Sequence, residues 1–123
     1  GGVLTGKYTD SFPEGARFTA YQTAGGRQQK MAGRFLNDRS RAFVECLKPI
    51  ADHLGITLTA LAVAWSRQHD FVASTIIGAT SVAQLEESLA AKDLILDGDT
   101  LRHIDEVDEQ IPTPLREDGL RRL

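Results

Sequence analysis

Residues 71–78 form a short run, Phe-Val-Ala-Ser-Thr-Ile-Ile-Gly, that is rich in β-branched side chains and lacks the spacing of a helix. Such a run, closed by glycine, is typical of a β-strand that is buried on both faces. Because the peptide groups of a buried strand must be hydrogen-bonded, the strand needs neighbours on both edges. The sequence predicts a single strand, at 71–77. Its neighbours must come from the N-terminal segment, from missing sequence or from another chain.

The composition is that of a globular protein, and it excludes several functions. Of the 123 residues, 41% are hydrophobic and 25% are charged, so a buried core is expected. The net charge of −3 lacks the basic excess of a nucleic-acid-binding protein, so we expect no nucleic-acid partner. No apolar stretch approaches the roughly 20 residues that cross a membrane. The single cysteine and the absence of a secretion signal favour the cytoplasm.

The first third of the chain, residues 1–34, contains most of the glycines and shows no sustained period of a helix or a strand. This pattern predicts a long loop with little regular structure. Lys7, Arg17 and Arg27 make the loop suitable for binding an anion. A floppy N-terminal arm without such a role is an equally good explanation.

Helices are predicted for most of the remaining chain. The first contains Pro49, where we expect a kink or a break, and it stops at Gly55. The second begins at Thr57, and its many alanines indicate close packing against a neighbour. The predicted segments are a helix pair at 35–69, a helix at 81–92, a C-terminal helix at 99–110 and a tail at 112–123.

Gly78 connects the predicted strand to a helix whose start carries a capping box, Ser81 followed three residues later by Gln84. A helix N-terminus offers free N–H groups and a positive dipole end, so this junction is a candidate phosphate site. Gln84, Glu87 and Ser88 share one side of the first turns, where they could bind an adenine or a ribose. An ordinary capped turn with exposed polar residues is the commoner explanation of the same pattern.

Other patterns that carry chemistry are incomplete in this sequence. The segment from Gly1 to Lys7 matches most of a phosphate-binding loop, but Tyr8 replaces the hydroxyl residue that binds magnesium. The three histidines lie far apart and the cysteine, Cys46, stands alone, so we expect neither a metal site nor a catalytic residue. Asp97 or Asp99 is expected to cap the last helix.

Several motifs occur together in a specific order. They are Gly2-Val-Leu-Thr-Gly-Lys-Tyr8, Arg17 ten residues after Lys7, and the run from Thr75 to Glu87. In this order and spacing they resemble the aldo-keto reductase family, above all its Tas-like and potassium-channel β-subunit branch. The helix pair between them is similar to the same branch, and the resemblance extends to about Ile111.

The resemblance implies an α/β fold, namely the C-terminal part of a (β/α)8 TIM barrel. An isolated chain of this kind would be mostly α-helical with one strand at about 71–77. The resemblance also implies the cofactor NADPH, with Lys7 and the backbone of Gly1 near the pyrophosphate and Arg17 at the adenosine 2′-phosphate. The other implied contacts are to phosphate and ribose from Gly78, Thr80 and Gln84, and to adenine from Glu87 and from Ser88, where the family usually has asparagine.

The family transfers a hydride from the nicotinamide to a small carbonyl substrate, with a tyrosine as proton donor beside an aspartate, a lysine and a histidine. These four do not match positions of this sequence, so we expect the chain to be the cofactor-binding portion of such a reductase. Alone it is expected to be inactive and to bind NADPH weakly or not at all. The alternative is a truncated, non-catalytic helical oligomer with a nucleotide-binding or structural role, and upstream coding sequence would distinguish the two. The isolated chain is also expected to self-associate, because its strand and helix faces would expose apolar surface.

Overall fold

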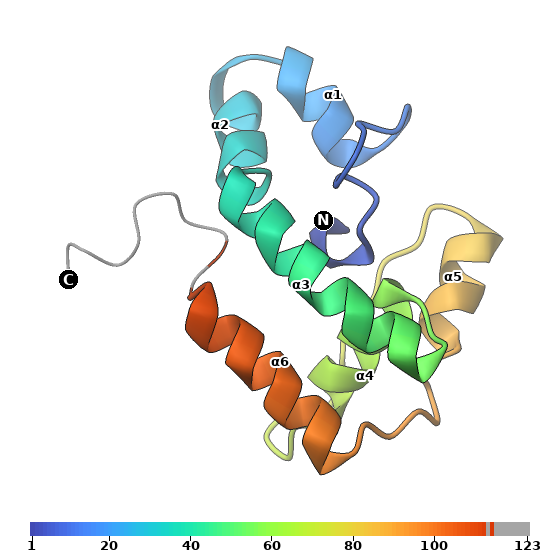
Figure 1. Ribbon diagram of the computed structural model, residues 1–123. Coiled ribbons are helices and arrows are strands. Elements are labelled where there is room, and N and C mark those ends of the chain that lie inside the picture. Colours follow the sequence, from blue (N-terminus) through green and yellow to red (C-terminus); the bar gives the residue numbers. More distant parts are fainter. Residues whose placement is uncertain (113, 115–123) are drawn as a thin grey trace.

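The computed structural model describes residues 1–112 and 114 (Figure 1). Helices account for all regular secondary structure in that part of the chain. They are the 3-10 helix η1 (Val3–Thr5) and the α-helices α1 (Arg17–Thr23), α2 (Gly26–Phe35), α3 (Asp38–Leu54), α4 (Leu58–Gln68), α5 (Val82–Leu89) and α6 (Gly98–Gln110). Of the predicted tail at 112–123, only Pro112 and Pro114 belong to the described residues.

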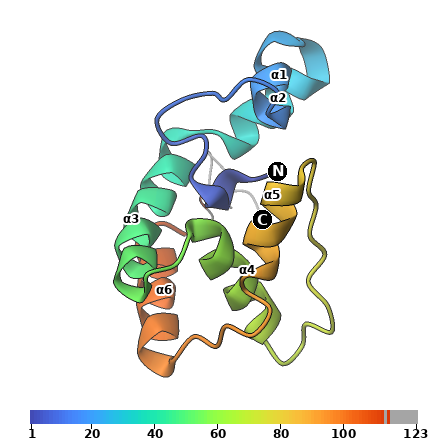
Figure 2. The same cartoon turned by 90° about the vertical axis from the view of Figure 1, so that its right-hand side faces the viewer.

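The prediction of a strand at 71–77 is wrong for this structure. These residues form an irregular segment that leaves α4 and runs along the outside of the molecule to α5 (Figure 2). Phe71 is 85% exposed and Ile76 is 96% exposed, so the segment is not buried on either face. The reason is the lack of a neighbour: a strand without a partner leaves its peptide groups unpaired, whereas a helix pairs its own.

The prediction of a loop at 1–34 is also wrong in part, because η1, α1 and most of α2 lie within it. The N-cap positions of α1 and α2, Ala16 and Gly25, provide no side-chain cap, so the usual signal of a helix start is missing. Tertiary packing stabilises these short helices instead. Four buried residues form their shared core, Tyr8, Phe18, Ala32 and Leu36.

The first helix of the predicted pair begins later than expected and is not interrupted. The side chain of Asn37 accepts a hydrogen bond from the Ser40 N–H, and the Ser40 hydroxyl accepts one from the Asn37 N–H. This reciprocal cap separates α2 from α3. Pro49 lies inside α3 without a break. Because Pro49 and Glu45 are both exposed, water can bond the Glu45 carbonyl that proline leaves without a helical donor.

Most other helix boundaries agree with the sequence signals, but α5 ends at Leu89, three residues before the predicted end at 92. Gly55 ends α3 in the left-handed conformation at φ 65°, which favours glycine. The Thr57 side chain accepts a hydrogen bond from the Ala60 N–H at 3.1 Å and caps α4. At α6, Asp97 takes the capping role that the sequence assigned to Asp97 or Asp99, and its carboxylate accepts from the Thr100 N–H at 2.8 Å.

The larger core lies between α3, α4 and α6, with the connection after α5 packed against it. Small side chains allow the backbones to approach: Ala64 and Ala91 are completely buried, and Ala51 is 1% exposed. This confirms the close packing that the alanines of α4 predicted. Leu61, at 2% exposed, fills the space between the small residues.

The connection between α5 and α6 is tied to the end of α4 by side chains. The Gln68 amide donates to the Leu96 carbonyl at 2.6 Å and accepts from the Leu96 N–H at 2.8 Å. Arg67 donates to the Leu94 carbonyl at 2.7 Å. The peptide groups of Leu94 and Leu96 thus bond to side chains of α4 and not to a neighbouring strand.

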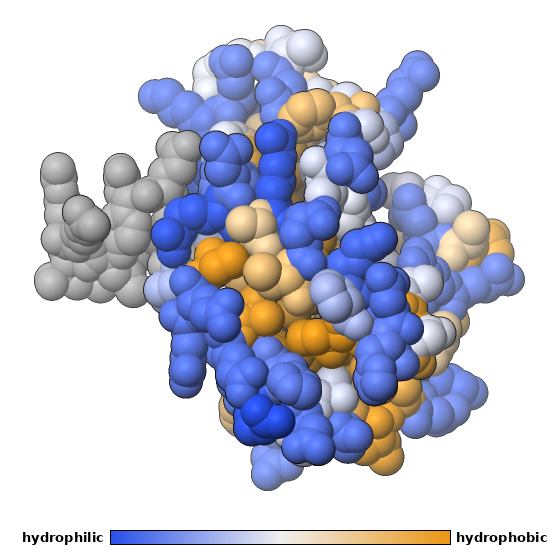
Figure 3. Space-filling model, in the orientation of Figure 1, coloured by the Kyte–Doolittle hydropathy of each residue, from blue (hydrophilic) through white to orange (hydrophobic). Residues whose placement is uncertain are grey.

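Apolar side chains also lie on the surface. In Figure 3 they are visible over α5 and along the lower right edge of the molecule. Among the described residues, no single helix is long and apolar enough to cross a membrane. The pair α3 and α4 satisfies the length and composition test only when joined, and it is bent by 92° at the break.

The close approach at Ala64 gives a prediction about stability. In Ala64→Leu the added side chain has no space, and we expect the free energy of unfolding to fall by about 1–3 kcal/mol. Ala62→Leu, on the half-buried side of the same helix, should change it much less. Urea unfolding followed by circular dichroism measures both values, and equal losses would contradict the packing described.

The cap of α6 gives a prediction about pH. Hydrogen bonds from Thr100 lower the pKa of the Asp97 carboxyl below its usual value of 3.8. A lowered folded-state pKa stabilises the protein above the unfolded value, and this contribution is lost as the pH falls through the folded value. In Asp97→Asn the side-chain oxygen can still accept a hydrogen bond, but the side chain no longer titrates. This variant should therefore lose less stability between neutral pH and about pH 2 than the unchanged protein.

Thermal unfolding across this pH range measures the difference. Asp108→Asn is the control, because Asp108 lies on the same helix and receives no hydrogen bond in the described structure. If both variants show the pH profile of the unchanged protein, the Asp97 cap does not have the assigned electrostatic role.

Candidate functional site

Two buried aromatic residues organise the N-terminal part of the candidate site. Tyr8 is 2% exposed and Phe18 is 3% exposed, and their ring centroids lie 5.8 Å apart. The Tyr8 hydroxyl accepts a hydrogen bond from the Phe18 N–H at 3.2 Å. This N–H belongs to the first turn of α1, where helical N–H groups lack partners and where Ala16 supplies no cap. Tyr8 therefore caps α1 from ten residues away.

A cation directly precedes each of the two aromatic residues in the sequence. Lys7 directly precedes Tyr8, and Arg17 directly precedes Phe18. Both segments lie against the first residues, because the Phe18 ring packs beside Gly1 and the Lys7 side chain packs beside Gly2. Within the described part of the chain, neither cation makes a salt bridge. Together with Gly1 they form what we call the cationic corner.

The backbone of the cationic corner depends on glycine. Gly2 has φ +80°, and a Cβ added there would lie 2.6 Å from Lys7 Cε and 2.7 Å from Lys7 Nζ. A Cβ on Gly1 would lie 2.5 Å from the Phe18 ring. The lysine stem thus folds back over Gly2, and Lys7 Nζ lies 5.1 Å from the centre of the Tyr8 ring. The Lys7 ammonium is held close to the backbone of the first residues.

The second group of predicted site residues lies at the start of α5. The Ser81 hydroxyl accepts from the Gln84 N–H at 3.3 Å, which confirms Ser81 as the N-cap. In the predicted capping box the Gln84 side chain would accept from the Ser81 N–H. Its oxygen instead accepts from the Thr80 N–H at 2.9 Å and from the Thr80 hydroxyl at 3.1 Å. Both bonds use the amide oxygen, so the amide nitrogen of Gln84 can donate to a ligand.

The other three predicted residues differ in accessibility. Gly78 is exposed, and a Cβ added there would meet nothing within 4 Å, so the backbone is open to a ligand. Glu87 is half-buried. Ser88 is 9% exposed, and as arranged it offers little surface for a contact with adenine.

The structure therefore forms two groups from the predicted residues: the cationic corner, and the start of α5 with Gly78, Thr80, Gln84 and Glu87. Figures 1 and 2 show the amino end of α5 at about the same height as Gly1. The sequence reasoning missed Tyr8 and Phe18, which fix the cationic corner. An aromatic residue directly after each cation was the available signal.

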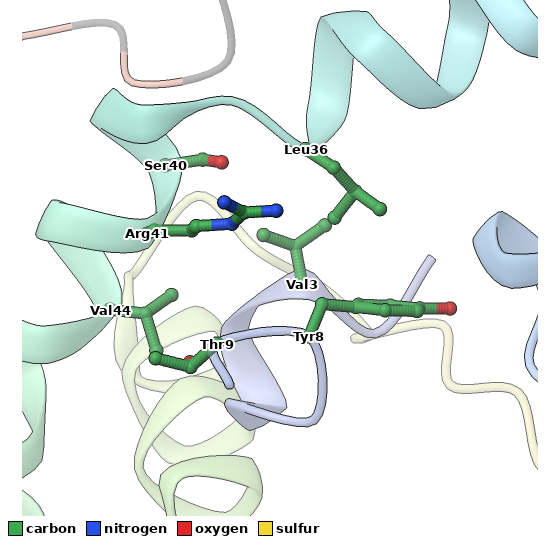
Figure 4. A pocket seen from close by; sticks show the side chains of 7 residues that line it. All are labelled: Val3, Tyr8, Thr9, Leu36, Ser40, Arg41 and Val44. Atoms are coloured by element: carbon green, nitrogen blue, oxygen red, sulfur yellow. The ribbon is translucent and has the colours of Figure 1, made fainter. Parts of the chain in front are cut away.

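A small pocket beside η1 is a separate feature (Figure 4). Its free volume is about 10 Å³, enough for one water molecule and far too small for a nucleotide. The guanidinium of Arg41 reaches into it, and Arg41 Nε is buried without a protein partner. The lining residues are Val3, Tyr8, Thr9, Leu36, Ser40, Arg41 and Val44. No group of three metal-binding side chains occurs in the described residues.

Comparisons with known proteins give a consistent result. The family model described as the aldo/keto reductase family matches residues 1–109. A protein of Schizosaccharomyces pombe named as a voltage-gated potassium channel subunit beta is 36% identical over 109 residues, which is 86% of this chain and 30% of that protein. Proteins of the same name from Arabidopsis thaliana and Oryza sativa are 42% and 41% identical over 95 residues, 76% of this chain. The chain thus spans less than a third of the length of these relatives.

The role of the Tyr8 hydroxyl can be tested by removing it. Tyr8→Phe leaves the Phe18 N–H buried without an acceptor, and we expect the free energy of unfolding to fall by about 1–3 kcal/mol. The Phe18 amide should also exchange its hydrogen faster. Tyr21→Phe is the matched control, because Tyr21 packs against Phe18 edge to face but its hydroxyl accepts no hydrogen bond in the described structure. Unchanged exchange at Phe18 in Tyr8→Phe would contradict the cap.

Proposed function

Because the chain belongs to the aldo/keto reductase family, we propose that it forms the part of an NADPH site that binds the adenosine and phosphate end of the cofactor. Family membership points to an oxidoreductase function and to a parent with a TIM barrel. The described residues of this chain are helical, so the barrel strands are not reproduced in it.

The observation that carries the proposal is the cationic corner. Lys7 and Arg17 form no salt bridge among the described residues, and they flank the same aromatic contact near the first residues, so they can attract an anion with several charges. The Tyr8–Phe18 contact ties the backbone beside Lys7 to the backbone beside Arg17, which lowers the entropy lost when both residues bind one ligand. In the proposal Lys7 and the backbone of Gly1 bind the pyrophosphate, and Arg17 binds the 2′-phosphate.

The start of α5 supports the same proposal. Thr80 is held by the oxygen of Gln84, so the two side chains keep a defined arrangement before a ligand binds. The N–H groups of the first turn of α5 and the exposed backbone of Gly78 provide donors for phosphate or ribose. Glu87 can accept from the amino group of adenine. Ser88 does not fit its proposed contact, because it is buried.

When bound in the parent enzyme, NADPH supplies a hydride to the carbon of a carbonyl substrate. The residues of this chain bind and orient the far end of the cofactor and take no part in proton transfer. A carbonyl also needs a positioned proton donor, and the chain has no residue that matches the tyrosine used by the family. We therefore propose that the isolated chain is inactive.

Binding of nucleotides to the isolated chain tests the proposal. We expect weak binding, with a dissociation constant of about 1 mM, for 2′,5′-ADP and NADPH. Lys7→Ala should weaken binding of NADPH and NADH alike, about tenfold or more, because it removes a charge-assisted contact to the pyrophosphate. Arg17→Ala should weaken NADPH alone and so remove the preference over NADH. Ligand-observed NMR measures all three ligands.

Arg27→Ala is the matched control. Arg27 is an exposed cation of the same N-terminal region, on α2, and has no role in the proposed site. If the unchanged chain binds no nucleotide, or if Arg27→Ala weakens binding as much as Arg17→Ala, the proposal is wrong.

A further inference from the structure

Tyr21 is an aromatic residue of α1 that the proposed site does not use. The helices α1 and α2 lie side by side at one end of the molecule (Figure 1). The Tyr21 ring is half-buried and packs against the aromatic core of these helices, with its centroid 6.0 Å from that of Phe18 and the two ring planes at 68°. This packing holds the ring, while the hydroxyl at its tip can still donate and accept hydrogen bonds.

The Tyr21 side chain extends toward the turn of α1 that carries Arg17. The two residues are four positions apart, so they are neighbours on one side of the helix, with Cβ atoms about 5–6 Å apart. Long side chains on a helix point toward its amino end, and the contact of Tyr21 with Phe18, three residues earlier, follows this rule. The Tyr21 side chain and the exposed Arg17 therefore adjoin the same turn.

We propose that Tyr21 is a specificity-determining residue of the cofactor site, whose hydroxyl donates a hydrogen bond to the 2′-phosphate bound by Arg17. This inference rests on the proposed function, because it requires Arg17 at that phosphate. A phosphate monoester presents three strong acceptor oxygens, and a guanidinium binds two of them as a fork. The third oxygen is left for another donor beside the arginine, and the Tyr21 hydroxyl is such a donor.

The charges around Tyr21 favour a dianion. From residue 15 to residue 37 the sequence contains no Asp or Glu, whereas it contains Arg17, Arg27, Lys30 and Arg34. All four cations are exposed, so α1 and α2 form a positively charged end in a protein of net charge −3. Such a field attracts phosphates in general, and a directional donor adds the preference for one position of the phosphate on the ligand.

Removing the Tyr21 hydroxyl separates an effect on binding from an effect on folding. Among the described residues this hydroxyl makes no hydrogen bond, in contrast to the Tyr8 hydroxyl, which accepts from the Phe18 N–H. Tyr21→Phe therefore keeps the ring and its packing against Phe18 and removes the donor alone. A purely structural role of Tyr21 would leave ligand binding by this variant unchanged.

Two pairs of ligands that differ by the 2′-phosphate test the proposal: 2′,5′-ADP against 5′-AMP, and NADPH against NADH. We expect Tyr21→Phe to weaken binding of 2′,5′-ADP and NADPH about tenfold, because it removes one hydrogen bond to a charged acceptor. Binding of 5′-AMP and NADH should not change. NMR titration of the whole chain measures all four affinities.

Thr23→Val is the matched control. It removes another hydroxyl of α1, one that donates to the Ala20 carbonyl and lies outside the proposed contact, so all four affinities should stay the same. Tyr21→Ala tests a different role, the stacking of the ring on adenine. If Tyr21→Ala weakens all four ligands and Tyr21→Phe weakens none, the ring acts by stacking and the proposal is wrong. Circular dichroism checks that the variants keep the helical fold.

The results also separate this inference from the proposed function. If Arg17→Ala removes the preference for the 2′-phosphate and Tyr21→Phe does not reduce it, the inference is overturned and the proposed site stands. An equal loss of 5′-AMP and 2′,5′-ADP binding in Tyr21→Phe would overturn it as well. If the unchanged chain binds none of the four ligands, the proposed function and the inference both fail.

Discussion

A peptide group that leaves water needs a hydrogen-bond partner, and the elements of this chain differ in where they find one. A helix provides its own partners, so α3, α4 and α6 can pack closely through small side chains, and α1 and α2 can pack around Tyr8 and Phe18, without any sheet. A strand depends on a neighbouring strand for its hydrogen-bond partners, and the described residues contain no neighbouring strand. The segment 71–77 consequently stays on the outside, and the molecule has two helical cores connected without a sheet.

Sequence reasoning succeeded where a helix boundary has a chemical marker. Gly55, Thr57, Ser81 and Asp97 mark the ends of α3, α4, α5 and α6, and the structure uses each as expected. It failed where boundaries depend on distant contacts. The helix α1 has no capping residue and depends on a hydroxyl ten positions earlier, which no local pattern reveals. The strand prediction failed because the local preference of residues 71–77 for a strand is not sufficient without a neighbouring strand.

The candidate site could be predicted as a set of residues but not as an arrangement. Lys7 and Arg17 were identified through the family resemblance, while the aromatic contact that joins their neighbours belongs to the core. Likewise, Gln84 was expected to complete a local cap, and its side chain instead holds Thr80. Ser88 shows the opposite case: helical spacing places it beside Gln84, yet packing against the body buries it.

The bonds from Gln68 and Arg67 have a mechanical consequence for α5. They anchor the connection that follows the carboxyl end of this helix, whereas its amino end follows seven residues, 73–79, without backbone hydrogen bonds in the described structure. The connection after α5 is thus hydrogen-bonded to α4, and Ser88 near that end of the helix is buried, whereas Thr80 and the residues before it have no backbone bond to the body in the described structure. A partner that bonded the backbone of 71–77 would therefore also hold the residues next to Thr80 and Gln84.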